Sequence, residues 1–409
     1  MMLFVLAPDL NRELRDAPYA ERHHHRQRGE PAIRDGIRRP GPSERRPRRQ
    51  RQDDRDRRRW QRGPDIRWRR PDLQGHSHGG GDHLAATVTG FGDYVFLDDD
   101  AQAMSGDAHG GNDVLHVDAS TSIYASLGIF GDAETAMSAD TGGGNDVVIA
   151  SMGNRSSGTF GGDSGNSMSD HARGGNDILS VTQVGSYGGA SMSGDALVSM
   201  SGDAHGGNDM LIYTVGAAAQ SGGASLVGDA GYMSDDTRGG NDILIATVDA
   251  NPDSTSIVLV GDASNMSGNA HGGDDILLGS SRDDLLYGDA QTYAPFTAGS
   301  ITGGKDMLNG GGGNDQLWGG PNDDRFVFDK NSGLDVINDF DQGNKAVGST
   351  AREHDLINLH DYGFADWAAL KSLISDDSTG NAVIHLTATD TITLAGVHTA
   401  DLRAKDFIV

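Results

Sequence analysis

The sequence predicts an all-β protein built as a parallel β-solenoid, followed by a small, mostly-β C-terminal domain with one short helix. Three observations lead to this architecture: the 409 residues include 60 glycines, a Gly-Asp pattern returns at regular intervals, and short apolar patches follow each return. Glycine at this density disfavours helix, because it destabilises helix interiors. A single repeat of this Gly-Asp pattern with its short apolar patch cannot bury the apolar residues alone, so successive repeats must stack on one another.

Residues 1–75 are predicted to be a disordered, Arg-rich tail. They contain 21 Arg, no Lys and 12 acidic residues, and they show no hydrophobic period. A GC-rich region upstream of the true start codon would also encode many Arg and no Lys if translation were assigned too early. Whether the natural protein contains this segment therefore stays open. The rest of the chain holds 12 basic and 47 acidic residues. A body this acidic repels itself and argues against nucleic acid as a partner.

Residues 76–269 are predicted to form glycine-rich repeats of about 32 residues. A Gly-Gly-Asn-Asp tetrapeptide or a close variant ends at Asp113, Asp146, Asp177, Asp209, Asp242 and Asp275, and each copy precedes an apolar patch. Between these copies, Gly-Asp recurs at Asp132, Asp163, Asp195, Asp229 and Asp262, and Met-Ser recurs as a third element. Each unit should supply two or three short strands, and stacking should align the six aspartates of the tetrapeptides into a ladder. The sequence leaves open whether a unit makes one wide coil or two narrow ones.

Residues 270–327 contain shorter repeats of nine residues. Gly310–Trp318 and Gly319–Val327 are contiguous copies with glycines in the first half, an aspartate at the sixth place and an apolar residue at the eighth. Glycine allows the tight curl that turns carbonyl oxygens inward, and carboxylate and carbonyl oxygens together suit Ca²⁺. These residues resemble the nonapeptides of the repeats-in-toxin (RTX), or hemolysin-type, calcium-binding proteins.

The RTX resemblance implies a β-roll in which calcium lies between turns of neighbouring coils. By position, the implied ligands are the sixth-place side chains and nearby turn residues: Asp275, Asp284, Asp306, Gly310, Gly312, Asn314, Asp315, Gly319, Pro321 and Asp324. Asp113, Asp146, Asp177, Asp209 and Asp242 share the local tetrapeptide and are candidate ligands as well. For these five, the alternative is that Asn-Asp simply makes a tight turn stabilised by its own hydrogen bonds.

Residues 328–409 lose the glycine rhythm and are predicted to form strands near 335–340 and 355–359, a helix near 364–374, and a hairpin from 382–386 and 391–394. The chain ends in Asp406-Phe407-Ile408-Val409. This segment is similar to the C-terminal domain of serralysin-type secreted proteases, in which an acid and three apolar residues are read by a type I exporter. The resemblance implies secretion to the extracellular space, with such an exporter as a partner.

Candidate catalytic groups are sparse. The chain has no His-Glu-x-x-His zinc motif, and Gly162-Asp163-Ser164-Gly165, which looks like a serine-protease segment, falls where Gly-Asp is periodic. No apolar run approaches the roughly 20 residues needed to cross a bilayer. We therefore expect a secreted, non-enzymatic protein that folds on Ca²⁺ and acts in structure, adhesion or recognition of a glycan or cell surface. The alternatives are a polysaccharide-acting enzyme on a β-helix and a non-catalytic remnant of a secreted protease or toxin.

Overall fold

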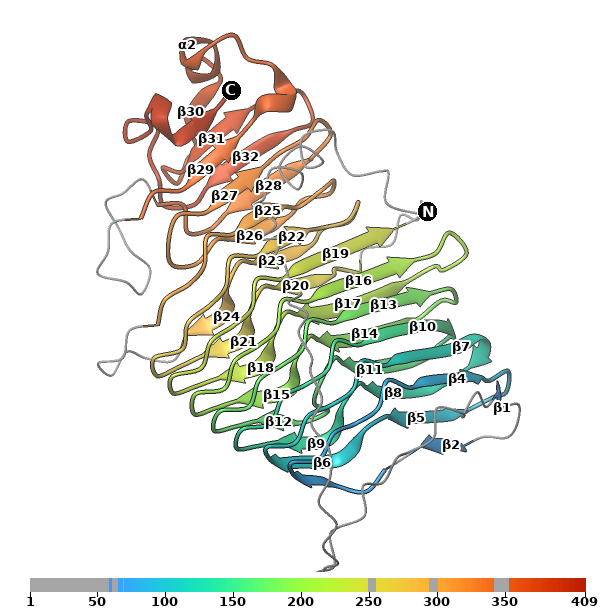
Figure 1. Cartoon of the computed structure of the whole chain (residues 1–409). Coiled ribbons are helices and arrows are strands. Elements are labelled where there is room, and N and C mark those ends of the chain that lie inside the picture. Colours follow the sequence, from blue (N-terminus) through green and yellow to red (C-terminus); the bar gives the residue numbers. More distant parts are fainter. Residues whose placement is uncertain (1–58, 61–64, 69, 249–254, 294–300, 342–352) are drawn as a thin grey trace, which may run out of the picture. The chain divides into compact units, whose positions relative to one another are not determined.

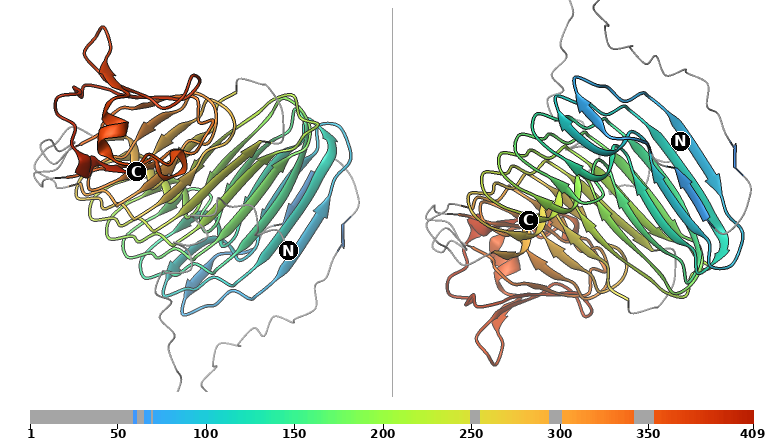
Figure 2. Two further views of the ribbon diagram at one scale, coloured as in Figure 1. Left: turned by 90° about the horizontal axis from the view of Figure 1, so that it is seen from above. Right: turned by 90° about the horizontal axis from the view of Figure 1, so that it is seen from below.

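A computed structural model describes residues 59–60, 65–68, 70–248, 255–293, 301–341 and 353–409. In this part the chain winds as a β-solenoid whose strands fall into three sheets, with short helices only near the C-terminus (Figure 1). This confirms the predicted fold class. Figure 2 shows the same coils stacked one on another from above and from below.

Sheet A has 12 strands, and each is a neighbour of the strand one coil away. In spatial order they are β1 (Arg59–Trp60), β4 (His83–Thr87), β7 (Val114–Ile123), β10 (Val147–Asn154), β13 (Ile178–Gln183), β16 (Met210–Val215), β19 (Ile243–Val248), β22 (Ile276–Leu278), β25 (Met307–Asn309), β27 (Arg325–Val327), β29 (Leu356–Asn358) and β33 (Phe407–Ile408).

Sheet B has 13 strands, and all but the last two pairings are parallel. In spatial order they are β2 (Asp65–Trp68), β5 (Tyr94–Asp98), β8 (Ser126–Phe130), β11 (Ser157–Gly161), β14 (Gly188–Ser193), β17 (Gly222–Val227), β20 (Val258–Val260), β23 (Leu285–Tyr287), β26 (Gln316–Trp318), β28 (Leu334–Ile337), β32 (Thr391–Leu394), β31 (Ala382–His385) and β30 (Ile374–Asp376).

Sheet C has eight strands and ends where the coils become narrow. In spatial order they are β24 (Ala290–Tyr293), β21 (Ala263–Met266), β18 (Ala230–Met233), β15 (Ala196–Met200), β12 (Ser167–Met168), β9 (Ala133–Met137), β6 (Ala101–Gly106) and β3 (Leu73–Gly75).

Each repeat of about 32 residues makes one wide coil of three strands, which answers the question that the sequence left open. Like residues stack on like: Ile178 pairs with Met210, and Met210 pairs with Ile243 one coil further. The first coil, β1–β3, lies before residue 76, so the solenoid begins earlier than the predicted boundary. Residues 1–58 of the predicted tail lie outside the described residues.

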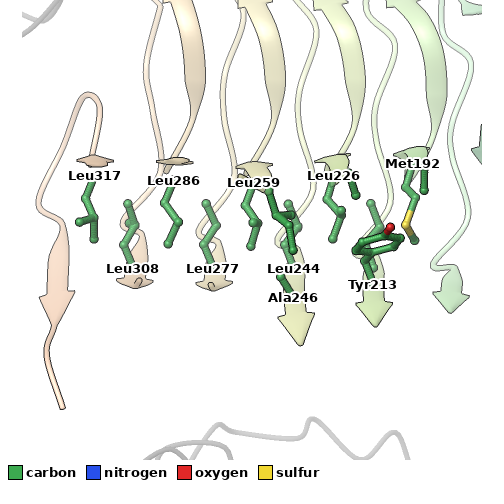
Figure 3. Close-up of a cluster of buried hydrophobic side chains, with 14 of the residues drawn as sticks. Met192, Tyr213, Leu226, Leu244, Ala246, Leu259, Leu277, Leu286, Leu308 and Leu317 are labelled. Carbon is green, nitrogen blue, oxygen red and sulfur yellow. The ribbon is translucent and has the colours of Figure 1, made fainter. Parts of the chain in front are cut away.

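The solenoid has two separate apolar cores. The main core lies between sheets A and B, where inward side chains of successive coils form facing columns such as Leu244, Leu277 and Leu308 opposite Leu259 and Leu286 (Figure 3). The methionine core lies inside sheet C and consists of the Met-Ser methionines with small alanines around them. All six of these methionines are buried: Met104, Met137, Met168, Met200, Met233 and Met266.

After β24 the coils narrow to two strands, because the nonapeptides supply only three-residue strands and short turns. The C-terminal segment then closes the end of the stack. It contains the antiparallel pair β31–β32, the 3-10 helices η1 (His360–Tyr362) and η2 (Ala404–Asp406), and α2 (Trp367–Lys371), whose N-cap Asp366 accepts from the Ala369 N–H at 2.9 Å. The predicted hairpin and short helix are confirmed.

Candidate metal centre

The strand-A ladder is a column of buried aspartates that stand directly before sheet-A strands. The N–H of each donates to the Oδ1 atom of the aspartate one coil further, at 2.6–3.0 Å. The Oδ2 atom of every member is buried without a hydrogen-bond partner. Its members are Asp113, Asp146, Asp177, Asp209, Asp242, Asp275, Asp306 and Asp324. The predicted alignment of the tetrapeptide aspartates is therefore present.

A second column, the corner ladder, lies where the chain passes from sheet B to sheet C. Each of its aspartates accepts a hydrogen bond from the second glycine of the Gly-Gly pair that follows it, as Asp132 does from Gly144 at 2.8 Å and Asp195 from Gly207 at 2.9 Å. Its members are Asp100, Asp132, Asp163, Asp195, Asp229, Asp262 and Asp289, and all are buried.

The two ladders face each other across a narrow waist, where the chain leaves sheet B through Gly-Asp and returns to sheet A through Gly-Gly-Asn-Asp. Carboxylate oxygens of Asp100, Asp113 and Asp132 lie within 4.8 Å of one another. A Cβ atom on Gly131 would overlap both the Oδ2 atom of Asp146 and the carbonyl oxygen of Gly162. Glycine is thus required here by space, and the waist brings carboxylates and carbonyl oxygens of adjacent coils together.

At the N-terminal end of the waist, the chain supplies a cation of its own. The Arg70 guanidinium lies 2.6 Å from Asp82 and 3.4 Å from Asp99, and 3.8 Å from Asp100 of the corner ladder. Further along, the pKa of Asp177 is influenced by burial, by the carboxylates of Asp209, Asp146 and Asp132 and by the hydrogen bond from the Asp146 N–H. One guanidinium therefore compensates negative charge only at this end.

Burial dominates the electrostatics of the waist. Desolvation, and then repulsion from neighbouring carboxylates, raises the pKa of Asp177 and Asp209 well above the ordinary aspartate range. The same causes raise the pKa of Asp113 to about 10. A carboxylate in this position is satisfied in one of two ways, by taking up a proton or by binding a cation. The donor set is made only of carboxylate and carbonyl oxygens, which suits Ca²⁺ and offers nothing to a soft metal.

The two remaining predicted aspartate ligands, Asp284 and Asp315, lie at the turns from sheet A to sheet B, directly before the sheet-B strands β23 and β26. Asp315 is like the ladder members, since its Oδ2 atom is buried without a partner and its pKa is raised by burial to about 9. Asp284 differs, because its Oδ2 atom accepts from both the N–H and the hydroxyl of Ser280, and its Oδ1 atom accepts from the N–H of Ile257. Both oxygens of Asp284 are therefore engaged within the protein.

The predicted turn residues are placed as follows. A Cβ on Gly310 would overlap Asp315 Oδ2, and the Gly312 N–H donates to the carbonyl of Ser280 at 2.9 Å. The Gly319 N–H donates to Asp339 Oδ1 at 2.9 Å, and the Pro321 carbonyl lies beside Gly303. Asn314 is exposed, and its Oδ1 accepts from the Leu334 N–H at 3.1 Å. A Cβ on Gly319 would likewise overlap Asp324 Oδ2, so Gly310 and Gly319 both lie against an unpartnered carboxylate oxygen.

Sequence reasoning noted the period of Gly-Asp but did not assign the corner ladder as ligands. The signal that could have found it is the interval of 11 or 12 residues between each of the first six of these aspartates and the glycine that donates to it; for Asp289 the interval is 15 residues.

Comparison with known proteins gives no match to any family model, curated protein or solved structure. Among the described residues, none of the helices has the length and apolar character needed to cross a lipid bilayer.

Proposed function

We propose that this chain is a calcium-binding β-solenoid whose coils are held together by ions in the waist. The observation that carries this proposal is the column of buried, unpartnered Oδ2 atoms in the strand-A ladder, with the corner ladder opposite. Leaving a buried polar group unsatisfied costs about 1–3 kcal/mol, and more when it is charged. A column of such groups is therefore a strong driving force for cation uptake.

Ion binding at the waist would couple folding to calcium. Each ladder aspartate belongs to a different coil, so the ligands of one ion come together only when coils stack. In the unfolded chain they are dispersed, and binding free energy becomes folding free energy. Extracellular calcium modules bind at about 10⁻⁴–10⁻³ M, a range that favours folding outside the cell rather than in the cytosol.

The C-terminal tetrapeptide is consistent with export before folding. Asp406 is buried and accepts from the Arg403 N–H at 2.6 Å, while the Phe407 ring stacks on Trp367 with ring centroids 5.2 Å apart. Phe407 also pairs with Ile357 of sheet A. An exporter that reads these residues would need them free, and hence the chain unfolded. We propose that the protein is secreted by this route and acts outside the cell in structure, adhesion or recognition.

Ion counting tests the proposal. The full chain is dialysed against a calcium buffer that also contains excess magnesium as competitor. The bound metal is then measured by inductively coupled plasma mass spectrometry. We expect several calcium ions per chain, on the order of one for each interval of the strand-A ladder, and little magnesium. Less than one bound calcium ion per chain would contradict the proposal.

A further inference from the structure

A column of exposed residues, separate from the two aspartate ladders, lies on the outside of the solenoid at the turns that join sheet A to sheet B. The turn column consists of Phe91, Tyr124, Arg155 and Tyr187, from four successive coils. Five of the ten exposed large apolar side chains in the described part of the chain lie at these turns: Phe91, Ile123, Tyr124, Val184 and Tyr187. A concentration of this kind on an acidic surface marks an interaction site.

The side chains of the turn column form one stacked array. The ring centroids of Phe91 and Tyr124 are 5.2 Å apart. The Arg155 guanidinium lies 5.5 Å from the ring centroid of Tyr124 and 5.6 Å from that of Tyr187, so it is held between the two rings. It also donates to the Tyr124 hydroxyl, and the Tyr187 hydroxyl hydrogen-bonds Gln220 one coil further at 3.2 Å. Rings and polar groups are thus ordered before any ligand arrives.

Backbone conformation shows that large residues at these turns are not the choice that folding alone would make. Tyr124, Arg155 and Tyr187 have φ values of 59°, 54° and 61°, in the left-handed region that disfavours residues with a Cβ atom. The same solenoid has another left-handed column in the segment that returns from sheet C. There the residues are the small or turn-forming Gly106, Ala139, Asp170, Gly202, Asp235 and Gly268. Strain retained for bulky, exposed side chains points to function.

We infer that the turn column binds an extended, equatorially linked polysaccharide that runs along the solenoid axis. The apolar face of a pyranose ring packs on an aromatic ring, while Arg155 and Gln220 offer hydrogen bonds to hydroxyl groups. Successive coils are separated by the strand spacing of about 4.7–4.9 Å, which is close to the length of one sugar unit in an extended chain. A linear polymer can therefore meet equivalent turns in register.

The composition of the column favours a glycan over other occupants. It is one residue wide and mixes rings with a guanidinium and an amide, whereas a protein interface has a broad apolar centre. Its single cation on a chain of net charge −26 gives little attraction for anionic lipid or nucleic acid. The column lies at the far end of the sheet-A strands from the strand-A ladder, so it is separate from the waist and needs only that the solenoid is folded.

Titration calorimetry with cellohexaose and chitohexaose tests the inference, with maltohexaose, whose linkages curl the chain, as the control ligand. The test variant is Tyr124→Asn with Tyr187→Asn, because Asn tolerates the left-handed conformation. The matched control is Tyr232→Asn, which removes an equally exposed tyrosine (58%) from the outer face of sheet C. Circular dichroism before each titration verifies that all three proteins are folded.

We expect the wild-type chain to bind at least one of the two extended hexasaccharides more tightly than maltohexaose. The double variant should bind about tenfold or more weakly, as for the loss of central aromatic contacts, with a melting temperature equal to or above that of the wild type. Tyr232→Asn should bind normally. Absence of wild-type binding to both extended probes, equal binding by the double variant, or an equal loss in Tyr232→Asn would overturn the inference. Binding only to anionic vesicles, lost in the double variant, would overturn it in favour of a membrane surface.

Discussion

Replacing Asp209 with Asn isolates the cation-binding role of the strand-A ladder. Asp209 Oδ1 accepts from the Asp177 N–H at 2.7 Å, and the Asp209 N–H donates to Asp242 Oδ1 at 2.7 Å. Asparagine keeps the Oδ1 acceptor and the shape of the side chain, so the turn and its hydrogen bonds remain. It replaces the unpartnered Oδ2 atom with an NH₂ group, which cannot ligate a cation.

The expected destabilisation depends on the calcium concentration. A site present only in the folded state stabilises it by RT ln(1 + [Ca²⁺]/Kd), which is about 1.4 kcal/mol at ten times Kd and about 2.7 kcal/mol at one hundred times Kd. Asp209→Asn should lose this contribution from each ion that it touches. The deficit in unfolding free energy should therefore grow by about 1.4 kcal/mol for each tenfold rise in calcium, per ion lost.

The assay is urea unfolding, followed by circular dichroism at three calcium concentrations, for wild type, Asp209→Asn and the control Asp140→Asn. Asp140 is a suitable control because its side chain is 76% exposed and its ion pair with His171 is long, at 3.6 Å. Asp140→Asn should follow the wild type at every concentration. If the deficit of Asp209→Asn is the same at all calcium levels, the aspartate acts only in the turn and the reasoning is refuted.

Three further predictions follow from the waist and the cores. Gly207→Ala should cost about 1–3 kcal/mol or more in saturating calcium, because its Cβ would overlap the carbonyl of Gly175; Gly216→Ala, which has space, should be neutral or stabilising in the same urea titration, and equal losses would contradict the packing of the waist. Met200→Ala should lower the unfolding free energy in calcium by about 2–5 kcal/mol, since this side chain is fully buried, and a loss below 1 kcal/mol would show that the methionine core collapses around it. In metal-free buffer the folded state should gain stability as pH falls. Burial raises the pKa of Asp315 to about 9, so the folded form keeps a proton that the unfolded form loses near pH 4. As pH rises between these two values, the unfolding free energy should decrease by about 1.4 kcal/mol per pH unit for each such group. Circular dichroism of the metal-free chain at pH 4.5 and 7.5 checks this sign, and more β-structure at pH 7.5 would be the wrong result.

The solenoid and the alignment of its tetrapeptides could be predicted because both depend on local periodicity. Gly-Gly-Asn-Asp returns with nearly constant spacing, so stacking places Asp146 beside Asp177 whatever the detailed path of the coil. The C-terminal hairpin and helix α2 also carry local signals, namely alternation in 382–394 and helical spacing from Phe364 to Ile374. Two cores within one coil could not be inferred, since the waist depends on where distant parts of the chain meet.

The part of the candidate site that sequence reasoning missed is the part formed by long-range contacts. Asp132 meets Gly144 only because the chain leaves sheet B and returns past the same point, and Arg70 lies within a segment that composition alone assigns to a disordered tail. At Asp284 the nonapeptide pattern is intact, but Ser280 four residues earlier engages one carboxylate oxygen. The turn column has no common residue type, so only its interval of 31–33 residues connects its members.

The most direct test of the calcium-bridged waist is the compactness of the full chain with and without the ion. Gel filtration and far-ultraviolet circular dichroism at neutral pH should show a compact β-protein in calcium and an expanded, largely unstructured chain after treatment with EGTA, with recovery when calcium is restored. An elution volume and spectrum that EGTA leaves unchanged would mean that the waist holds itself together without divalent ions.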